Sequence, residues 1–105
     1  MHSELAYWNS SGRITVNGYY TCDSSDDVDT LRVTVQQEVL GVVRFVGTYV
    51  SFEGICTGSA QPFSAPVAAE NGLFLPAVNV AVRAQLTTED GYAEESRTLQ
   101  PVVGP

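Results

Sequence analysis

Residues 13–22 read Arg-Ile-Thr-Val-Asn-Gly-Tyr-Tyr-Thr-Cys, and every second one of them is apolar or small. Side chains along a β-strand point alternately to opposite faces, so one face here carries Ile14, Val16, Gly18, Tyr20 and Cys22. A strand with one apolar face is typical of an antiparallel sheet whose inner side covers a core. This stretch therefore predicts a half-buried antiparallel strand.

The same alternation recurs along the chain, between short turn signals such as Glu89-Asp90-Gly91. No window of ten or more residues has the periodicity of an amphipathic helix. We expect further strands near residues 4–8, 30–39, 42–57, 62–68, 77–88 and 92–103, with Gly47 shifting the register within 42–57. Their predicted inward side chains are Leu31, Val33, Val35 and Val39, then Val50, Phe52 and Cys56, then Phe63, Ala65 and Val67, and last Val78, Val80, Val82, Ala84 and Leu86. The spacing predicts an all-β sandwich of seven or eight strands.

Three single positions add detail to this pattern. Pro62 and Pro66 lie inside a predicted strand, and because proline has no N–H for a hydrogen-bond ladder, we expect that strand at a sheet edge. Gln37 falls on the inward side of residues 30–39. Buried polar groups are almost always hydrogen-bonded, so we expect its amide to bond a buried backbone group.

The charge balance excludes several classes of function. The 105 residues contain five Arg, no Lys and twelve Asp plus Glu, which gives a net charge of -7. A protein that binds nucleic acid neutralises phosphates with a basic surface, so we expect no nucleic-acid partner. No stretch approaches the roughly 20 apolar residues of a membrane helix, so we expect no membrane insertion. The length fits a single domain over residues 1–105.

Side chains suited to catalysis are sparse. The only histidine is His2, at the terminus, so no internal Ser-His-Asp triad can be built. A glycosidase needs two carboxylates that flank one bond, whereas the neighbours Glu94 and Glu95 point to opposite faces of a strand. We therefore expect no enzymatic activity and no cofactor.

The two cysteines, Cys22 and Cys56, both fall on apolar faces by parity. An even number of cysteines in a small domain favours one disulfide and an oxidising compartment. Two buried free thiols in a cytosolic protein are the alternative. The disulfide would close a loop of 34 residues, and we expect the protein to be secreted or displayed at the cell surface.

Several segments together are similar to a known group of domains. They are Gly18-Tyr19-Tyr20-Thr21-Cys22, Leu31-Arg32-Val33-Thr34-Val35-Gln36-Gln37, Cys56-Thr57-Gly58, Pro62-Phe63 and Val78-Asn79-Val80-Ala81-Val82-Arg83-Ala84. The chain resembles, over about residues 12–88, the small secreted immunoglobulin-like sandwich domains of uncharacterised function from actinobacteria. The resemblance implies an immunoglobulin-like antiparallel sandwich, a Cys22–Cys56 bridge and export. It departs from antibody domains, which carry a core Trp between their cysteines, because Trp8 precedes both.

One acidic segment is a weak candidate for calcium. Residues 23–29 hold four carboxylates, Asp23, Asp26, Asp27 and Asp29. Calcium takes six to eight oxygen ligands, but this run lacks the spacing, the Gly and the final Glu of an EF-hand loop. A solvated loop is the competing interpretation, and we expect no tightly bound metal.

Two groups of apolar residues are candidate contacts. Tyr7, Trp8, Tyr19, Tyr49 and Tyr92 are candidates for a platform that stacks on sugar rings or anchors a partner, or for cross-strand pairs. Leu73, Phe74 and Leu75 lie beside a turn, where they either form a contact region or plug one end of the sandwich. The predicted interior has no spare polar groups, so we expect function on loops and outward faces.

These observations favour a non-enzymatic binding module, secreted or surface-displayed, with a protein or glycan partner. The alternative from another class is a structural subunit of an extracellular or phage assembly, of the decoration or surface-layer type, in which case the protein is an oligomer. A carrier of a small apolar ligand between the sheets is a third possibility.

Overall fold

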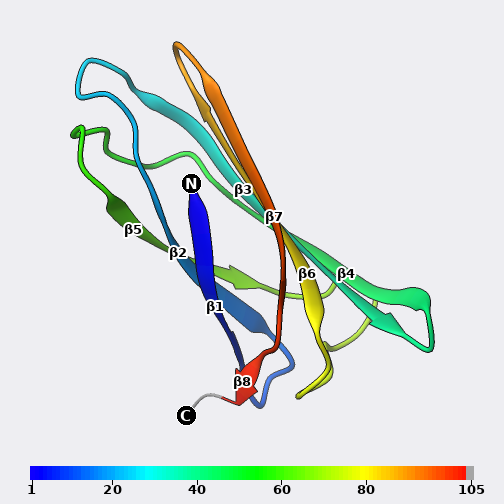
Figure 1. The fold of residues 1–105 in the computed structure, drawn as a ribbon. Helices are drawn as coiled ribbons and strands as arrows, with labels where there is room; N and C mark the ends of the chain where they lie inside the picture. The colour runs from blue at the N-terminus through cyan, green and yellow to red at the C-terminus, as the bar shows by residue number, and fades with distance from the viewer. Residues whose placement is uncertain (104–105) are drawn as a thin grey trace.

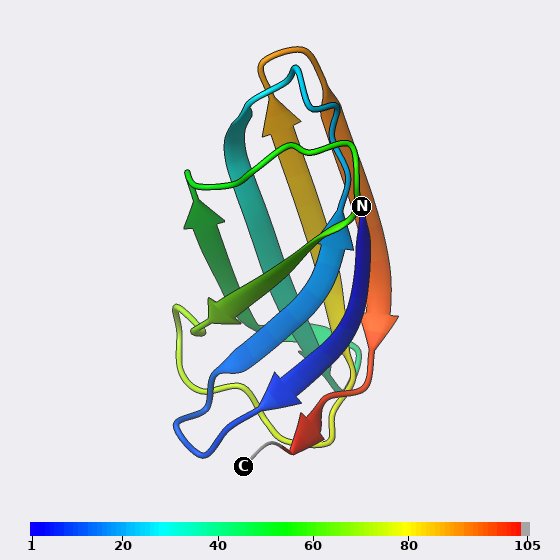
Figure 2. The same cartoon turned by 90° about the vertical axis from the view of Figure 1, so that its left-hand side faces the viewer.

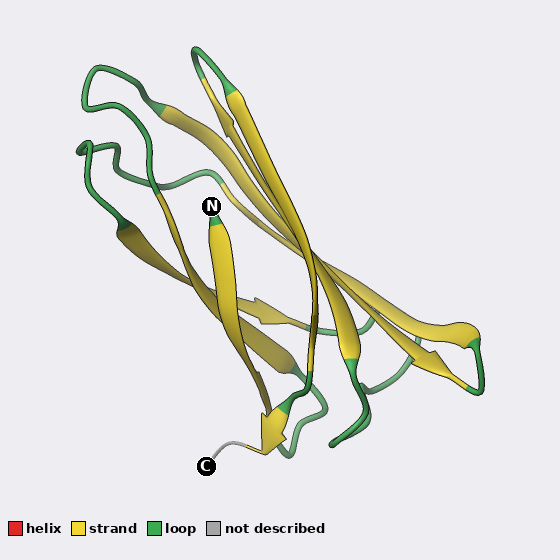
Figure 3. Cartoon of the chain, viewed as in Figure 1, coloured by secondary structure: helices red, strands yellow, loops and turns green. Residues whose placement is uncertain are grey.

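The computed structural model of the protein describes residues 1–103 and contains eight β-strands in two packed layers (Figure 1). Figure 3 shows that strands and loops make up the whole described chain, without a helix. The strands are β1 (His2–Trp8), β2 (Ile14–Tyr20), β3 (Val28–Val39), β4 (Val42–Ser51), β5 (Gln61–Val67), β6 (Val80–Thr88), β7 (Tyr92–Leu99) and β8 (Val102–Val103).

The strands form two sheets of four. We call them the β2 sheet, with the order β5-β2-β1-β8, and the β3 sheet, with the order β4-β3-β6-β7. Figure 2 views the molecule with the β2 sheet in front of the β3 sheet. All neighbours are antiparallel except β1 and β8, which are parallel. Strands β1, β2 and β5 stand where an immunoglobulin domain has A, B and E, and β3, β6 and β7 where it has C, F and G. The predicted immunoglobulin-like sandwich is confirmed.

The core lies between the sheets and is built from the alternation seen in the sequence. Each of β2, β3, β5 and β6 buries every second residue. The fully buried side chains include Ile14, Val16, Val33, Val35, Val67, Val80, Val82 and Leu86. Side chains of this size contribute about 1.5–3 kcal/mol each when they leave water, so the inner faces hold the two sheets together.

The predicted strand over residues 42–57 is wrong in its end and in its facing. Strand β4 ends at Ser51, and Phe52 is 75% exposed in the loop that follows. Gly47 pairs with Val35 without a register shift, and the irregularity lies instead between Gln37 and Glu38. Val50 pairs with Arg32 and so faces outward. Gly47 faces inward because a Cβ there would stand 2.2 Å from the backbone oxygen of Ala68.

The predicted last strand, 92–103, is divided between the sheets. Strand β7 ends at Leu99 in the β3 sheet, and β8 pairs with β1 in the β2 sheet. Pro101, which is buried, lies between them.

The disulfide joins Cys22 to Cys56, as predicted. It links the end of β2 to the loop between β4 and β5, rather than one strand to another. The Tyr20 hydroxyl accepts a hydrogen bond of 3.1 Å from the Ile55 backbone N–H and fastens the same loop. The architecture is thus that of an immunoglobulin domain, with a bridge in a different place from the B–F bridge of antibody domains.

Gln37 is fully buried, and its side-chain amide makes three hydrogen bonds to the backbone of the loop between β5 and β6. Its Nε2 donates to the carbonyls of Leu75 (2.9 Å) and Val78 (3.1 Å), and its Oε1 accepts from the Leu75 N–H (2.7 Å). The prediction for this residue is confirmed, and the loop between β5 and β6 is fixed to β3 by it.

Two lateral edges of the sandwich, β5 and the middle of β4, are protected against strand pairing, whereas β7 is an edge strand that pairs with β6 alone. Strand β5 is an edge strand, as its prolines predicted. The middle of the β4 edge is covered by the β5–β6 loop, where Glu70 N–H donates to the Val46 carbonyl (2.8 Å) and Asn71 Nδ2 donates to the Arg44 carbonyl (2.5 Å). Prolines and covering loops are devices that keep sheet edges from pairing with other chains.

Candidate binding surface

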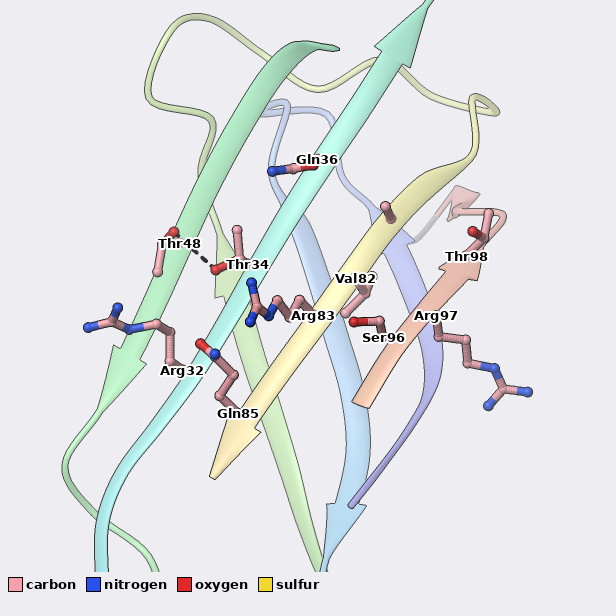
Figure 4. A pocket seen from close by; sticks show the side chains of 11 residues that line it. Arg32, Thr34, Gln36, Thr48, Val82, Arg83, Gln85, Ser96, Arg97 and Thr98 are labelled. Carbon is pink, nitrogen blue, oxygen red and sulfur yellow. Dashed lines mark hydrogen bonds between the residues drawn. The ribbon is translucent and has the colours of Figure 1, made fainter. Parts of the chain in front are cut away.

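The outer side of the β3 sheet is an open, polar surface. We call it the polar face, and it consists of the outward residues Arg32, Thr34, Gln36, Thr48, Ala81, Arg83, Gln85, Glu94, Ser96 and Thr98, with Tyr92 at one end and Val46 and Val50 along β4. A hollow of about 580 Å³ lies over its centre (Figure 4). Arg97 touches this hollow with its backbone, but Figure 4 shows its guanidinium turned away.

A chain of hydrogen bonds orders four side chains of the polar face. Gln85 Nε2 donates to the Tyr92 hydroxyl (2.9 Å), which donates to Glu94 Oε2 (2.8 Å). Glu94 Oε1 in turn accepts from Arg83 Nε. The register explains the cluster, because Gln85 lies directly opposite Glu94 in the β6–β7 pair. These contacts fix the side chains in place before any ligand arrives.

The charges of this cluster are set by its own hydrogen bonds. The bond from Arg83, then that from Tyr92, hold the pKa of Glu94 below its usual value. The same carboxylate raises the pKa of Arg83. Glu94 is therefore a carboxylate at neutral pH, suited to accepting hydrogen bonds and unsuited to donating a proton.

Arg32 is the second arginine of the polar face and lies opposite Gln85 in the β3–β6 pair. Within residues 1–103, the ion pairs are His2–Glu95 and Arg83–Glu94, and neither involves Arg32. A smaller hollow of about 280 Å³ is lined by Arg32, Gln85 and Tyr92, together with Thr30 and Thr87. Arg32 thus borders these two hollows without an ion-pair partner, whereas a third hollow of about 510 Å³ on the same face is lined by Gln36, Thr98 and the carboxylate residue Glu38.

The outer side of the β2 sheet has a different character. We call it the apolar face, and its outward residues are Leu5 and Tyr7 of β1, Tyr19 of β2, and Pro62 and Pro66 of β5, with Thr15, Asn17 and Ser64 between them. A hollow of about 470 Å³ lies beside Tyr19 and Pro62. The Oδ1 atom of Asn17 is buried there without a hydrogen-bond partner among the described residues.

The five predicted aromatic candidates are not brought together. Tyr7 and Tyr19 lie on the apolar face and Tyr92 lies on the polar face. Trp8 and Tyr49 are half-buried against the core. A single platform made of all five is therefore not formed.

The acidic segment is folded by its own carboxylates. Asp23 Oδ1 accepts from the Ser25 N–H and hydroxyl, both at 3.1 Å, and Asp26 Oδ1 accepts from the N–H groups of Asp27 (2.9 Å) and Asp90 (3.2 Å). These bonds lower the pKa of Asp23, and a hydrogen bond from the Thr88 side chain leads those that lower the pKa of Asp26. Asp27 and Asp29 are exposed. No group of three or more His, Cys, Asp or Glu arranged to hold a metal is found in residues 1–103.

The apolar triplet is anchored by its backbone. Phe74 N–H donates to the Gly12 carbonyl (3.0 Å), Trp8 Nε1 donates to the Phe74 carbonyl (2.7 Å), and Leu75 is held by Gln37. The Phe74 side chain is 1% exposed and closes one end of the sandwich, whereas Leu73 and Leu75 are 62% and 37% exposed. The two exposed leucines stay candidates for a contact region.

A second cluster joins the two sheets at the edge between β1 and β7. Glu95 Oε1 accepts from the Ser3 N–H (2.6 Å), and its Oε2 lies 3.2 Å from His2 Nδ1. Arg97 donates to the Ser3 carbonyl (2.7 Å). Glu94 and Glu95 thus serve opposite sides of β7, as their parity predicted, and do not form a catalytic pair.

Sequence reasoning missed two features. The first is the cluster on the polar face, although the turn at Glu89-Asp90-Gly91 is a signal from which the pairing of Gln85 with Glu94 can be worked out. The second is the tip of the β3–β4 hairpin, Val39-Leu40-Gly41-Val42-Val43, which projects from the sandwich in Figure 1. Leu40 is 98% exposed, and the signal was an apolar pair, Leu-Gly, at the turn.

Comparison with protein-family models, curated proteins and solved structures finds no match for this chain. None of the elements in the described residues is a helix long and apolar enough to span a membrane. The function must therefore be argued from the surfaces of this molecule.

Proposed function

We propose that this protein is a non-enzymatic binding module that works outside the cytosol and holds its partner on the polar face. The observation that carries the proposal is the ordered chain from Gln85 through Tyr92 and Glu94 to Arg83 on an open sheet surface. Side chains that are held in place before binding lose little entropy on binding, and this raises affinity.

The cluster has the composition of a recognition surface. It offers an amide, a phenol, a carboxylate and a guanidinium, and Tyr92 is 58% exposed. Exposed tyrosine and arginine are the residue types that contribute most to binding at interfaces. The Cys22–Cys56 disulfide supports a place in an oxidising compartment, as in secreted or surface proteins.

The experiment is a binding survey with defined probes on the purified protein. The probes are polygalacturonate, alginate, xylan, dextran and poly-L-glutamate, each measured by calorimetry against the wild type and Tyr92→Ala. We expect at least one probe to bind the wild type and to lose affinity at least tenfold with Tyr92→Ala, since truncating an anchoring tyrosine at an interface costs about 2 kcal/mol or more. The control is Tyr19→Ala on the apolar face, for which affinity is unchanged. Equal losses for both variants would contradict the proposal.

One observation favours a second function, that of a structural subunit in an extracellular or phage assembly. The hairpin tip 39–43 exposes Leu40, Val42 and Val43 with no contact to the sandwich at Gly41. Exposed apolar side chains at a projecting tip are typical of a contact between protein subunits, so an assembly of this protein would join through this tip. Light scattering separates the two functions: a monomer supports the binding module, whereas oligomers that Leu40→Asn dissolves support the assembly.

A further inference from the structure

We infer that the polar face takes a carboxylate-bearing polysaccharide, with a carboxylate of the sugar chain held between Arg32 and Arg83. The inference rests on the proposed function and names the class of ligand. It begins with the distribution of charge over the molecule.

The central hollow of the polar face is lined by positive charge alone. The charged residues among its lining are Arg32, Arg83 and Arg97, and no Asp or Glu lines it. The chain as a whole carries twelve acidic residues and five arginines. Glu94 pairs with Arg83 from beside the hollow, so the uncompensated positive charge there is that of Arg32, and it makes the hollow complementary to an anion.

The register places the two arginines at the right separation for one carboxylate. Arg32 is opposite Gln85 and Thr34 is opposite Arg83, so the two arginines are diagonal neighbours on β3 and β6. Diagonal neighbours on one face of a sheet are about 7–8 Å apart, which leaves room for a carboxylate between the guanidinium groups. In Figure 4 both guanidiniums lean toward β4, and the Gln85 amide is drawn between them.

Arg83 has donors to spare for this contact. A guanidinium carries five N–H donors, and Glu94 occupies the one on Nε. The terminal nitrogens remain for a ligand, while Glu94 keeps the group oriented. Arg32 has no ion-pair partner within residues 1–103, so its full charge is available.

The rest of the hollow favours a sugar chain over an acidic peptide. Around the arginines stand hydroxyl and amide groups that match the hydroxyls of a saccharide, from Thr34, Gln36, Thr48, Ser96 and Thr98. An acidic peptide seated in the hollow would anchor apolar side chains there, but no large apolar side chain lines the hollow apart from Val82. Tyr92 lies at one end of the same face, where its ring can stack on a sugar.

The decisive test compares two forms of one polymer. Polygalacturonate and its methyl ester have the same sugar chain, and the ester removes the charge. We expect the wild type to bind the acid form at least tenfold more tightly than the ester, because a charge-assisted hydrogen bond contributes more than a neutral one. Arg32→Gln and Arg83→Gln should each weaken binding of the acid form about tenfold, whereas Arg13→Gln, on the β2 sheet, should leave it unchanged.

The possible results distinguish a failure of this inference from a failure of the proposed binding function. Equal binding of acid and ester, or an equal loss with Arg13→Gln, overturns the inference. Binding of poly-L-glutamate as tight as that of polygalacturonate, with the same dependence on Arg32, overturns the saccharide class. A neutral polysaccharide that depends on Tyr92 but not on Arg32 overturns the inference and leaves the proposed function standing. No binding of any probe overturns the inference and removes the support for the function as well.

Discussion

The two outer faces of the sandwich are built by the same alternation and differ in their chemistry. The polar face carries Arg32 and Arg83 among hydroxyls and amides, whereas the apolar face carries mainly Tyr19, Pro62 and other uncharged side chains, with Glu4 lining its hollow. The inner faces of both sheets are aliphatic and resemble each other. The fold therefore constrains the inner positions of each strand and leaves the outer positions free, so specialisation for binding is found on the outside.

The largest expected loss of stability comes from removing the disulfide, and the same experiment tests whether the two sheets unfold as one cooperative unit. Replacing Cys22 and Cys56 together by Ala opens the loop of 34 residues that the disulfide closes. Loop entropy gives a loss of about 4 kcal/mol in the free energy of unfolding. We expect a single unfolding transition, shifted to lower denaturant, when it is followed by fluorescence and by circular dichroism. Two separate transitions would show that the sheets unfold independently.

The next effect contrasts an inner with an outer position on one strand. Gln37→Met leaves three backbone groups of the β5–β6 loop without their bonds, and each unsatisfied buried group costs about 1–3 kcal/mol. We expect a loss of about 3 kcal/mol in a urea titration, the low end of that sum, because Leu75 is partly exposed and water can reach its backbone. The matched control is Gln36→Met on the polar face, which should change stability by less than about 0.5 kcal/mol. Similar losses for the two variants would break the distinction between inner and outer positions.

A smaller change, this time a gain in stability, is expected at the tip of the β3–β4 hairpin, which belongs to neither face. Leu40 and Gly41 have φ angles of 56° and 78°, which makes the β3–β4 connection a two-residue turn of the type that favours Asn-Gly. A leucine in this left-handed region costs about 1–2 kcal/mol, and Leu40 makes up little of that by contact because it is almost fully exposed. Leu40→Asn should therefore stabilise the protein by about 1 kcal/mol and raise the Tm by roughly 4 °C or more.

The control for this prediction separates backbone strain from apolar exposure. Leu40→Ala removes the exposed side chain and keeps a non-glycine Cβ at positive φ, so its Tm should stay near that of the wild type. A rise in Tm as large as that for Leu40→Asn would assign the effect to the apolar side chain and contradict the explanation.

The smallest effect concerns the ion pair of the polar face. The contact with Arg83 lowers the pKa of Glu94 in the folded protein. The contact therefore stabilises the fold above the carboxyl's unfolded pKa, and this stability is lost as the pH falls through the lower, folded value. We expect Glu94→Gln to be less stable than the wild type at pH 7, with a difference that begins to shrink near the ordinary glutamate pKa of about 4.3 and disappears only as the pH falls through the lower, folded value. The control is Glu4→Gln, for which thermal unfolding should show little difference at either pH. A difference for Glu94→Gln that persists at pH 2 would mean that the charge is not its cause.

The sequence predicts correctly those parts of the fold that depend only on the alternation of side chains within one strand. Alternation places Ile14, Val35 and Ala84 inside correctly, and Pro62 marks an edge, because each of these depends on neighbours within one strand. The inward prediction for Val50 is wrong because the pairing of β4 with β3 decides which residues of β4 face the core, and Gly47 is the one that Ala68 approaches closely. Both contacts are distant in sequence.

The same limit applies to the candidate site. Because Val82 and Ala84 point inward, the alternation puts Arg83 and Gln85 on the outer face of their strand, but their grouping with Tyr92 and Glu94 depends on the register across a turn. Arg32 joins them only through the pairing of β3 with β6, more than 50 residues apart in places. The types of side chain were visible in the sequence, whereas the neighbourhood was created by folding.

The covering of the β4 edge has a consequence for aggregation. Fifteen of the 105 residues are valine, and β-branched strands with few charges are the segments that stack into amyloid when their edges are free. The bonds from Glu70 and Asn71 to β4 keep part of that edge closed. Local opening of residues 68–71, without unfolding of either sheet, would then be enough to expose a fibril-forming strand. Asn71, an exposed residue on a short loop, thereby helps to keep the middle of β4 from pairing with another chain.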